Sequence, residues 1–466
     1  MDRYAELRGW FTGDALDVTI GAGKKKTEKY PVRANPLQSA VAKHTSALFG
    51  TGSDIFSGTL VRPKAYSLDT ENATRNRDAE HVNDVITATW AQSNGAEIQI
   101  RNGMLSQIYG GSVYKLAWVP TDKMLDIPIR IESINPVYFF AIPSPSDYWT
   151  LQEAWVIIPI DRERALEYGI PTKQGGYYIE HWTPDWYSVK VNEYPLSVNY
   201  GQQDYVMDRP NPWGFVPFVY IPHVRYLNFW GTSLITDAAI GLVKEINLRL
   251  ADVGDHVSLV SHEIIATKNV QGAITVKHIP GVADYVDLGS AVGFSSGATE
   301  PNMWAVKRTP VTDSSIKLVG ELYDHLRREI YIPAVADGED EGSQRSGETL
   351  HVRMWPLTGH TRIERALHST GFARLYKMLL LMLAKKGEAG IKNKHLKIPV
   401  GSHWDPILPR GRGDLILELV NRKSANLGTL EHLLSLTGDI DDPAAMARLI
   451  MEETQNEQPN DTPLPG

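Results

Sequence analysis

The segment 337–347 carries acidic side chains and three glycines and contains no apolar residue. Such a segment cannot be packed into a hydrophobic core, so it must project into water or into a cavity. Apolar residues spaced three and four apart predict a helix on each side of it, over 316–330 and 348–387. Pro333 ends the first helix, and Trp355–Pro356 interrupts the second near its start. The sequence therefore predicts a flexible acidic loop held between two long helices.

A third amphipathic pattern, over 235–260, predicts another long helix. Its apolar side needs a partner, and the apolar side of 316–330 is the expected one. Between these two helices, residues 266–310 contain short β-type runs with few large apolar side chains, so this insert can bury little surface by itself. We expect neighbouring parts of the chain or neighbouring subunits to stabilise it.

The remaining regions predict a mixture of helices and strands. Helices are expected over 36–49, 79–93, 98–109, 415–420, 429–436 and 443–453, and strands over 113–118, 127–134, 137–142, 155–160, 177–182, 215–222 and 396–400. The tract 189–212 is polar and rich in turn residues, which predicts a hairpin or a long surface loop. The fold class is therefore α+β with an antiparallel sheet.

Charge and cysteine content exclude several classes of protein. The formal net charge of -8 argues against a protein that grips nucleic acid through a basic surface. The absence of cysteine excludes disulfides, thiolate catalysis and cysteine-ligated zinc. No apolar run is long enough to span a membrane, and the first residues lack the apolar stretch of a signal peptide, so we expect synthesis in the cytosol and no membrane partner.

The acidic segment partly matches a calcium-binding loop. Asp337, Glu339, Glu341, Gly342 and Glu348 fall on positions one, three, five, six and twelve of that loop. Glutamates at positions three and five would crowd it, however, and position eight lacks the apolar residue that tethers such loops. A mobile acidic loop without a specific metal is the preferred interpretation.

Other metal, cofactor and catalytic motifs are missing from the sequence. His360 and His368 lie eight residues apart, and His262–Glu263 is not followed by the second histidine of a zinc protease. Such histidines are expected to face solvent or to be satisfied in the core. No nucleophile elbow or dinucleotide-binding glycine turn occurs either. The prediction is therefore a protein with no catalytic residues, no metal and no cofactor.

Several short segments, in this order, resemble the portal proteins of tailed bacteriophages over most of the chain. They are 47–50 (ALFG), 108–115 (IYGGSVYK), 134–136 (INP), 217–219 (PFV), 231–234 (GTSL), 330–333 (IYIP), 346–350 (SGETL), 404–409 (WDPILP) and 438–443 (GDIDDP). The resemblance implies a portal-type fold: a wing made of helices and strands, a two-helix stem, a small clip that contains β-strands, a long kinked helix and a small helical crown.

The resemblance also implies domain limits. They are 1–230 for the wing, 231–265 for the first stem helix, 266–310 for the clip, 311–333 for the second stem helix, 334–348 for the tunnel loop, 349–410 for the long kinked helix with a wing strand, and 411–466 for the crown with a disordered C-terminal tail.

Portal proteins form rings, usually dodecamers, at one capsid vertex, and double-stranded DNA passes through the ring. The resemblance implies this role for the chain, in the virion after assembly in the host cytoplasm, with terminase, head-completion or tail-adaptor proteins, capsid and scaffolding proteins as partners. Its tunnel-loop residues would be Asp337, Glu339, Asp340, Glu341 and Arg345. Basic residues of the clip that would meet partners are Lys268, Lys277, Lys307 and Arg308, although a plain solvated surface is the alternative for each.

Two interpretations from other classes stay open at this point. A helical scaffold or adaptor would bind a partner through the apolar side of 235–260. A hydrolase would use two of the many carboxylates as acid and base, but it would leave the two long helices unexplained.

Overall fold

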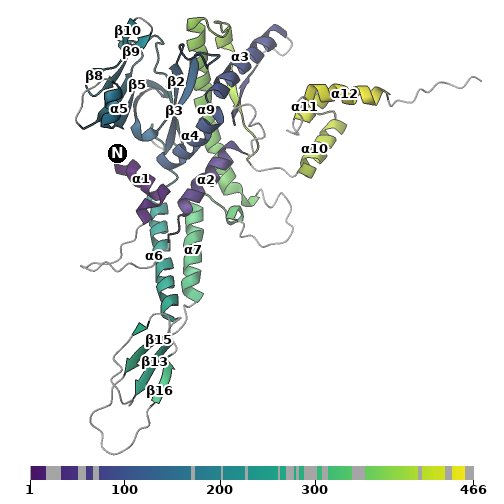
Figure 1. Ribbon diagram of the computed structural model, residues 1–466. Helices are drawn as coiled ribbons and strands as arrows, with labels where there is room; N and C mark the ends of the chain where they lie inside the picture. Colours follow the sequence, from purple (N-terminus) through teal and green to yellow (C-terminus); the bar gives the residue numbers. More distant parts are fainter. Residues whose placement is uncertain are drawn as a thin grey trace, which may run out of the picture. The chain divides into compact units, whose positions relative to one another are not determined.

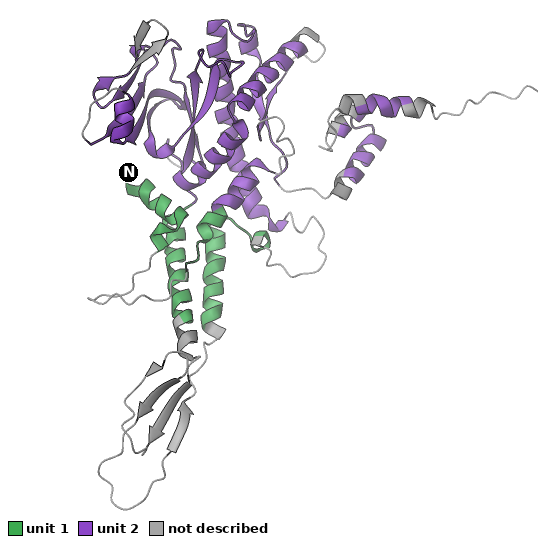
Figure 2. Cartoon of the chain, in the orientation of Figure 1, with its two compact units in different colours: residues 1–40, 235–341 green, residues 41–234, 342–466 purple. Residues whose placement is uncertain are grey.

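In a computed structural model of the chain, the structure describes residues 2–16, 33–50, 59–66, 73–168, 174–200, 203–225, 229–260, 263–268, 278–279, 283–287, 302–306, 313–337, 352–407, 412–435 and 443–456. The chain divides into two compact units, 1–40 with 235–341 and 41–234 with 342–466 (Figure 2). Both helices and strands are present, which confirms the α+β prediction (Figure 1). Within the described ranges, no helix is both long and apolar enough to cross a membrane.

The first unit is built around two helices that pack against each other, α6 (Asp237–Val260) and α7 (Asp313–Glu329) (Figure 1). Helix α6 buries Val243 and Ile246, and Leu326 and Ile330 are buried at the end of α7. The predicted pairing of the two amphipathic helices is thus confirmed. The apolar stripe of α7 is incompletely covered, however, because 60% of Ile316 is exposed near its start.

The N-terminal segment also packs on α6. It contains α1 (Asp2–Thr12) and the short 3-10 helix η1 (Asp14–Leu16), neither of which the sequence pattern predicted. The side chain of Asn247 on α6 accepts from the backbone N–H of Ala34 at 2.8 Å and donates to its carbonyl at 3.0 Å. The Lys244 ammonium lies 5.2 Å from the ring centre of Trp10, within the range of a cation–π contact.

A four-stranded sheet lies between α6 and α7 in the sequence. Its strands are β13 (Glu263–Lys268), β14 (His278–Ile279), β15 (Ala283–Asp287) and β16 (Asn302–Val306), in the order β14-β15-β13-β16. Strand β13 pairs in parallel with β15 and antiparallel with β16. The insert is therefore a small mixed sheet.

The second unit holds a three-stranded and a six-stranded sheet, and the strands of both pair antiparallel. The three-stranded sheet has the order β12 (Phe218–Pro222), β2 (Gly111–Trp118), β3 (Ile129–Ile134). The six-stranded sheet has the order β11 (Asp208–Pro210), β7 (Trp186–Val191), β6 (Gly176–Trp182), β5 (Asp147–Ile160), β4 (Phe139–Ser144), with β8 (Tyr194–Pro195) paired to β7. The tract 189–212 contains the hairpin of β9 (Ser197–Tyr200) and β10 (Gln203–Val206), so the hairpin prediction is confirmed.

Helices cover the three-stranded sheet and form the core together with its strands. These are α2 (Pro36–Phe49), α3 (Ala73–Gln92), α4 (Gly95–Tyr109) and α9 (Trp355–Lys386). Helix α4 packs on β2 and α9 packs on β12. The rings of Trp90, Tyr114 and Phe372, from α3, β2 and α9, meet edge to face with centres 5.5–6.0 Å apart. Edge-to-face aromatic contacts of this kind add to the energy of burial.

Helix α9 has clear end signals. Pro356 lies in its first turn, where a proline costs no hydrogen bond, so the predicted interruption near Trp355–Pro356 is where the helix begins. Gly387 ends the helix in a left-handed conformation with φ 72°. Along the helix, the Arg365 guanidinium donates to the carbonyl of Leu48 at 2.8 Å and thereby satisfies the C-terminal end of α2.

The shorter elements complete the second unit. They are β1 (Arg62–Ala65), which pairs with β17 (Val400–His403), the 3-10 helices η3 (Pro136–Tyr138) and η5 (His395–Lys397), and α5 (Arg162–Glu167); η4 (Ala334–Asp337) belongs to the first unit. The strand predicted over 396–400 is wrong for its first residues, because the N–H of Ile398 donates to the carbonyl of His395 and closes a turn there. The strand begins only at Val400.

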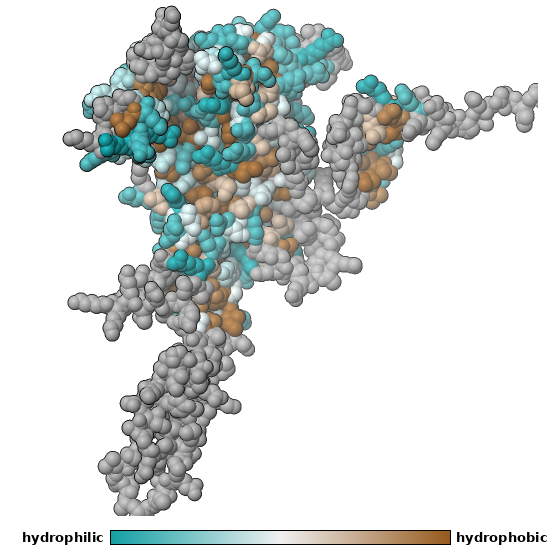
Figure 3. Space-filling view, in the orientation of Figure 1, coloured by the Kyte–Doolittle hydropathy of each residue, from teal (hydrophilic) through white to brown (hydrophobic). Residues whose placement is uncertain are grey.

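The C-terminal helices are α10 (Arg412–Ser424), α11 (Leu430–Ser435) and α12 (Pro443–Asn456). Figure 3 shows hydrophobic residues at the surface of this region. They include Leu417 on α10 and Leu449 on α12, which are 62% and 54% exposed. The predicted disordered tail lies largely outside the described residues, and the domain limits inferred from the resemblance stay predictions.

Candidate functional site

The acidic residues predicted for the loop lie almost entirely outside the described residues. Asp337 is the last residue of η4. Glu339, Asp340, Glu341 and Arg345 fall in the segment 338–351, which the structure does not describe. The tunnel-loop assignment therefore stays a prediction, and so does the preference for a mobile loop over a calcium site.

Most of the basic residues predicted for the insert also lie outside the described residues. Lys268 is the last residue of β13, beside Asn302 of β16. Lys277, Lys307 and Arg308 lie outside the described residues. The four lysine and arginine positions stay predictions.

Polar contacts fix the end of the α6–α7 pair at which α6 begins and α7 ends. The Thr236 hydroxyl, just before α6, donates to Glu329 Oε1 on α7 at 2.7 Å. On α6 itself, Arg249 lies 2.7 Å from Glu245 and 3.5 Å from Asp252, and these three side chains are about two-fifths exposed. Pairs of this kind contribute little to stability at a surface. They give α6 a charged, hydrated face, while the other face of the helix is packed.

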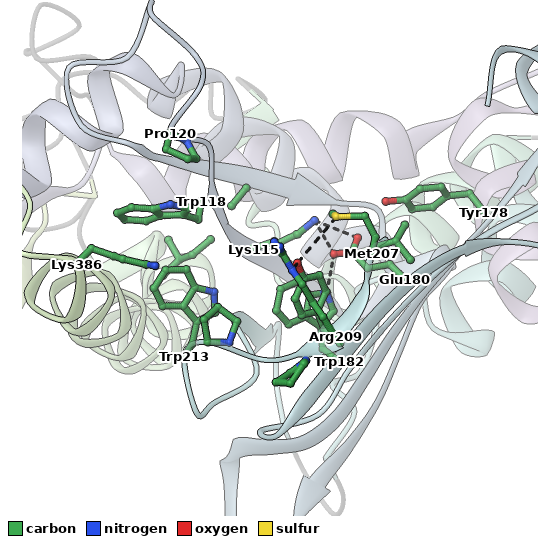
Figure 4. Close-up of a pocket in the computed structure, with 16 residues that line it drawn as sticks. Lys115, Trp118, Pro120, Tyr178, Glu180, Trp182, Met207, Arg209, Trp213 and Lys386 are labelled. Atoms are coloured by element: carbon green, nitrogen blue, oxygen red, sulfur yellow. Dashed lines mark hydrogen bonds and ion pairs between the residues drawn. The ribbon is translucent and has the colours of Figure 1, made fainter. Parts of the chain in front are cut away.

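Within the second unit, a pocket of about 520 Å³ opens between β2 and the strands β6 and β7. Its lining combines cations with aromatic rings and consists of Lys115, Leu116, Ala117, Trp118, Pro120, Tyr178, Glu180, Trp182, Tyr187, Val189, Met207, Arg209, Pro210, Pro212, Trp213 and Lys386. Figure 4 shows Trp118, Trp213 and Lys386 on one side and Lys115, Glu180 and Arg209 on the other.

The two sides of this pocket differ in chemistry. On one side, the Lys386 ammonium lies 5.9 Å and 5.7 Å from the ring centres of Trp118 and Trp213, which are 5.3 Å apart. On the other, Lys115 Nζ lies 2.8 Å from Glu180 Oε1, and Trp182 Nε1 donates to the same oxygen at 2.6 Å. Burial would lower the pKa of Lys115, but Glu180 and Glu132 outweigh it and raise the pKa above its usual range.

A second group of polar side chains is fully enclosed near the start of α9. His360, Glu364 and His368 follow one another at steps of four, so they share one face of the helix. All three are buried, so of the two predicted positions for His360 and His368, facing solvent or in the core, the structure has the core. His44 of α2 and His223, directly after β12, are buried beside them.

Glu364 is the centre of this group. Its Oε1 lies 2.5 Å from His223 Nε2, 3.1 Å from His360 Nε2 and 2.9 Å from Gln107 Nε2. Burial would raise the pKa of Glu364, but the charge and hydrogen bond of His223 and the hydrogen bond of His360 hold it well below its usual range. The carboxyl is therefore an anion inside the unit.

Sequence reasoning missed both the pocket and the partners of Glu364. Lys115 and Glu180 come from different sheets, and His44, His223 and His360 come from distant segments, so no local motif joins them. One signal was present: His360 and Glu364 stand at helical i, i+4 spacing, which places two ligand-type side chains together.

Comparison with known proteins gives one family. The sequence profile described as "Phage portal protein, SPP1 Gp6-like" matches residues 56–460. No curated protein matches the chain at a significant level.

Proposed function

We propose, from the premise that this chain belongs to the SPP1 Gp6-like family of phage portal proteins, that it forms the ring-shaped channel at a capsid vertex through which double-stranded DNA is packaged and later ejected. Membership of the family makes the chain a phage portal protein and a component of the virion capsid. The channel, the dodecameric ring and the passage of DNA through it are the parts of the proposal that go beyond family membership.

The observation that carries the proposal is the helix pair α6–α7 with a small sheet inserted between its two helices. The family match spans both helices and the sheet. A two-helix stem with a β-containing clip is what a portal subunit requires in this part of the chain. The small sheet offers few apolar residues for a core of its own, and packing against neighbouring subunits of a ring would supply the missing burial.

The acidic loop suits a conduit that lets DNA slide. Each firm contact between a lysine or arginine and a phosphate adds a barrier of counterion exchange to movement along DNA. In a ring, Asp337, Glu339, Asp340 and Glu341 of every subunit would form stacked negative rings that repel phosphates. Arg345 would be the cation of the loop that meets DNA or pairs with a neighbouring subunit.

The clip is the proposed docking surface for other packaging components. Lys268 ends β13, and Lys277, Lys307 and Arg308 lie near the other strands of the sheet in the sequence. In this proposal they bind terminase during filling and head-completion or tail-adaptor proteins afterwards, through acidic patches on those partners. Capsid and scaffolding proteins would contact the ring at the vertex during assembly in the host cytoplasm.

The adaptor alternative loses its main support in the structure. It required a free apolar side on 235–260, but α6 packs against α7 and Asn247 binds the backbone of Ala34. No observation on the described residues favours the hydrolase alternative.

Oligomeric state tests the proposal most directly. The full chain, purified at several concentrations, should form closed rings in negative-stain images and a single large species in native mass spectrometry. A protein that remains a monomer or dimer under conditions that support packaging in extracts would overturn the ring. A ring that forms but supports no DNA packaging in a reconstituted terminase reaction would overturn the channel role instead.

A further inference from the structure

Four buried side chains from three separate segments converge inside the second unit: His44 on α2, His223 directly after β12, and His360 with Glu364 on α9. None of them exceeds 8% exposure. The ligand-type atoms of His44, His360 and Glu364 all lie within 4.8 Å of one another. The His223 ring lies beside this group of three, 5.0 Å from the His360 ring, centre to centre.

The distances within the group resemble one face of a metal coordination shell. Nε2 of His223 and Nε2 of His360 are 3.1 Å apart, and they lie 2.5 Å and 3.1 Å from Glu364 Oε1. A tetrahedral zinc ion holds nitrogen and oxygen ligands at roughly 2.0–2.2 Å, which places neighbouring ligand atoms about 3.3 Å apart. Small outward shifts of His223 would therefore open the shell to an ion.

The hydrogen bond of His223 on its other side fixes which atom faces the group. Its Nδ1 lies 2.7 Å from the carbonyl oxygen of Thr232, and a carbonyl can only accept, so Nδ1 carries the proton. When His223 carries no second proton, its Nε2 directs a lone pair at the carboxylate of Glu364. Two lone pairs at that distance repel each other unless a cation or a proton lies between them. Histidines that bind metals commonly donate their second ring N–H to a backbone carbonyl in this way.

One oxygen of the Glu364 carboxylate is available to bind a further ligand. Its Oε1 faces His223, His360 and Gln107, while Oε2 is buried and finds no hydrogen-bond partner among the described residues. A buried carboxylate without full compensation is costly. A divalent cation would compensate the charge and engage a carboxylate oxygen at the same time.

From this geometry we propose that His44, His223, His360 and Glu364 form a binding site for a first-row divalent transition-metal ion of the zinc class. Three imidazoles and one carboxylate select zinc, cobalt or nickel over magnesium and calcium, which prefer shells made entirely of oxygen. The ion ties α2, the segment after β12 and α9 together. Its role is structural and goes beyond the proposed channel.

Metal content of the wild-type full chain is the first test. After treatment with a chelator and dialysis, the protein is incubated with Zn²⁺ alone, passed through a desalting column and analysed by mass spectrometry for bound metal. We expect about one Zn²⁺ per chain. With Co²⁺ in its place, we expect the visible absorption of a tetrahedral nitrogen–oxygen site. At a free Zn²⁺ concentration 100 times the Kd, the unfolding equilibrium constant should fall about 100-fold (about 2.7 kcal/mol).

Variants test which residues bind the metal ion. His360→Ala and Glu364→Gln should each lose bound Zn²⁺ and the Co²⁺ absorption, while His325→Ala, at an exposed histidine of α7, should retain both. Wild-type protein that binds no metal after this treatment overturns the proposal, and then a proton bridges His223 and Glu364. Folded variants that bind Zn²⁺ as tightly as wild type overturn it as well. Should a variant fail to fold, the wild-type stoichiometry and Co²⁺ spectrum decide the question alone.

Discussion

Lys115 and Glu180 form an ion pair that joins the two sheets of the second unit, with Nζ 2.8 Å from Oε1. Lys115 belongs to β2 of the three-stranded sheet and Glu180 to β6 of the six-stranded sheet. Their side chains are only 14% and 4% exposed. The pair therefore replaces apolar packing with a buried charge contact in the lining of the pocket in Figure 4.

Removal of the ammonium should destabilise the protein strongly. Lys115→Met leaves the Glu180 carboxylate buried, with the indole of Trp182 as the remaining close donor among the described residues, so we expect a loss of about 3–5 kcal/mol in the free energy of unfolding. The double change Lys115→Met with Glu180→Gln should recover part of this loss, because no unpaired charge remains buried.

Urea unfolding followed by tryptophan fluorescence measures both variants of this pair. A matched control is Arg422→Met, which breaks a pair with Glu418 that is about two-fifths exposed, and it should cost less than about 1 kcal/mol. Equal losses of unfolding free energy for Lys115→Met and Arg422→Met would show that the cross-sheet pair contributes no more to stability than the exposed pair.

Two helix-ending glycines should respond differently to alanine. Gly110 ends α4 and Gly387 ends α9, both with positive φ, so each change costs about 1–2 kcal/mol of backbone strain. At Gly110 an added Cβ would also stand 2.5 Å from the carbonyl oxygen of Gly231, whereas at Gly387 it meets nothing within 4 Å. We expect Gly110→Ala to lose at least about 1 kcal/mol more than Gly387→Ala, from the added steric clash.

Thermal and urea unfolding of the two glycine variants, side by side, check this difference. The contrast isolates the close approach of the two backbone segments, since both variants share the strain of the left-handed conformation. If the two variants lose equal stability, the contact between Gly110 and Gly231 is looser than the structure places it.

Local patterns predicted the long helices well. Helices α6 and α7 follow from apolar spacing, and α9 follows from the same spacing with Pro356 and Gly387 as end signals. The strand predicted over 396–400 was partly wrong because Leu396 and Lys397 belong to the 3-10 helix η5 (His395–Lys397). Such a turn depends on tertiary contacts that a short pattern does not contain.

Contacts between distant segments could not be predicted from the sequence. The β-branched and aromatic residues of 113–118 indicate a strand, yet nothing in them shows that Lys115 will face Glu180 of another sheet. The partners of Glu364 could not be predicted for the same reason, because His44 and His223 reach it only through the packing of α2 and β12 near α9. Of that group, the i, i+4 pair of His360 and Glu364 was the part visible in the sequence.

Acid should weaken the contact between β5 and α9 around Asp147. The Thr150 hydroxyl and the Trp149 N–H donate to its carboxylate at 2.5 Å and 3.0 Å, and Arg374 lies 3.5 Å away. The Thr150 hydrogen bond most of all, then the Trp149 N–H, lowers the pKa of Asp147 below its usual value, against a small opposing effect of burial.

The sign of this pH dependence follows from the lowered pKa. The ionised Asp147 contributes stability above the unfolded pKa, about 3.9, and the contribution is lost as pH falls through the lower pKa of the folded protein. Asp147→Asn should therefore be less stable than wild type at pH 7, and the difference should shrink below about pH 4. Urea unfolding at pH 7, 4 and 3 measures it; a difference that is constant across these pH values would contradict the assignment.

The acidic loop offers the sharpest test of the channel. We expect a variant with Asp337, Glu339, Asp340 and Glu341 all changed to Ser to assemble into rings but to package or retain DNA at least about tenfold less well, a change of about 1.4 kcal/mol. Without the carboxylates, Arg345 would dominate the loop and hold phosphates, which slows sliding. The matched control removes the same number of carboxylates from exposed positions of the second unit: Glu80, Glu163, Glu167 and Glu193, each to Ser. Because both variants lose equal charge, a defect confined to the loop variant locates the effect at the loop, and wild-type packaging in that variant would refute a role for its negative charge.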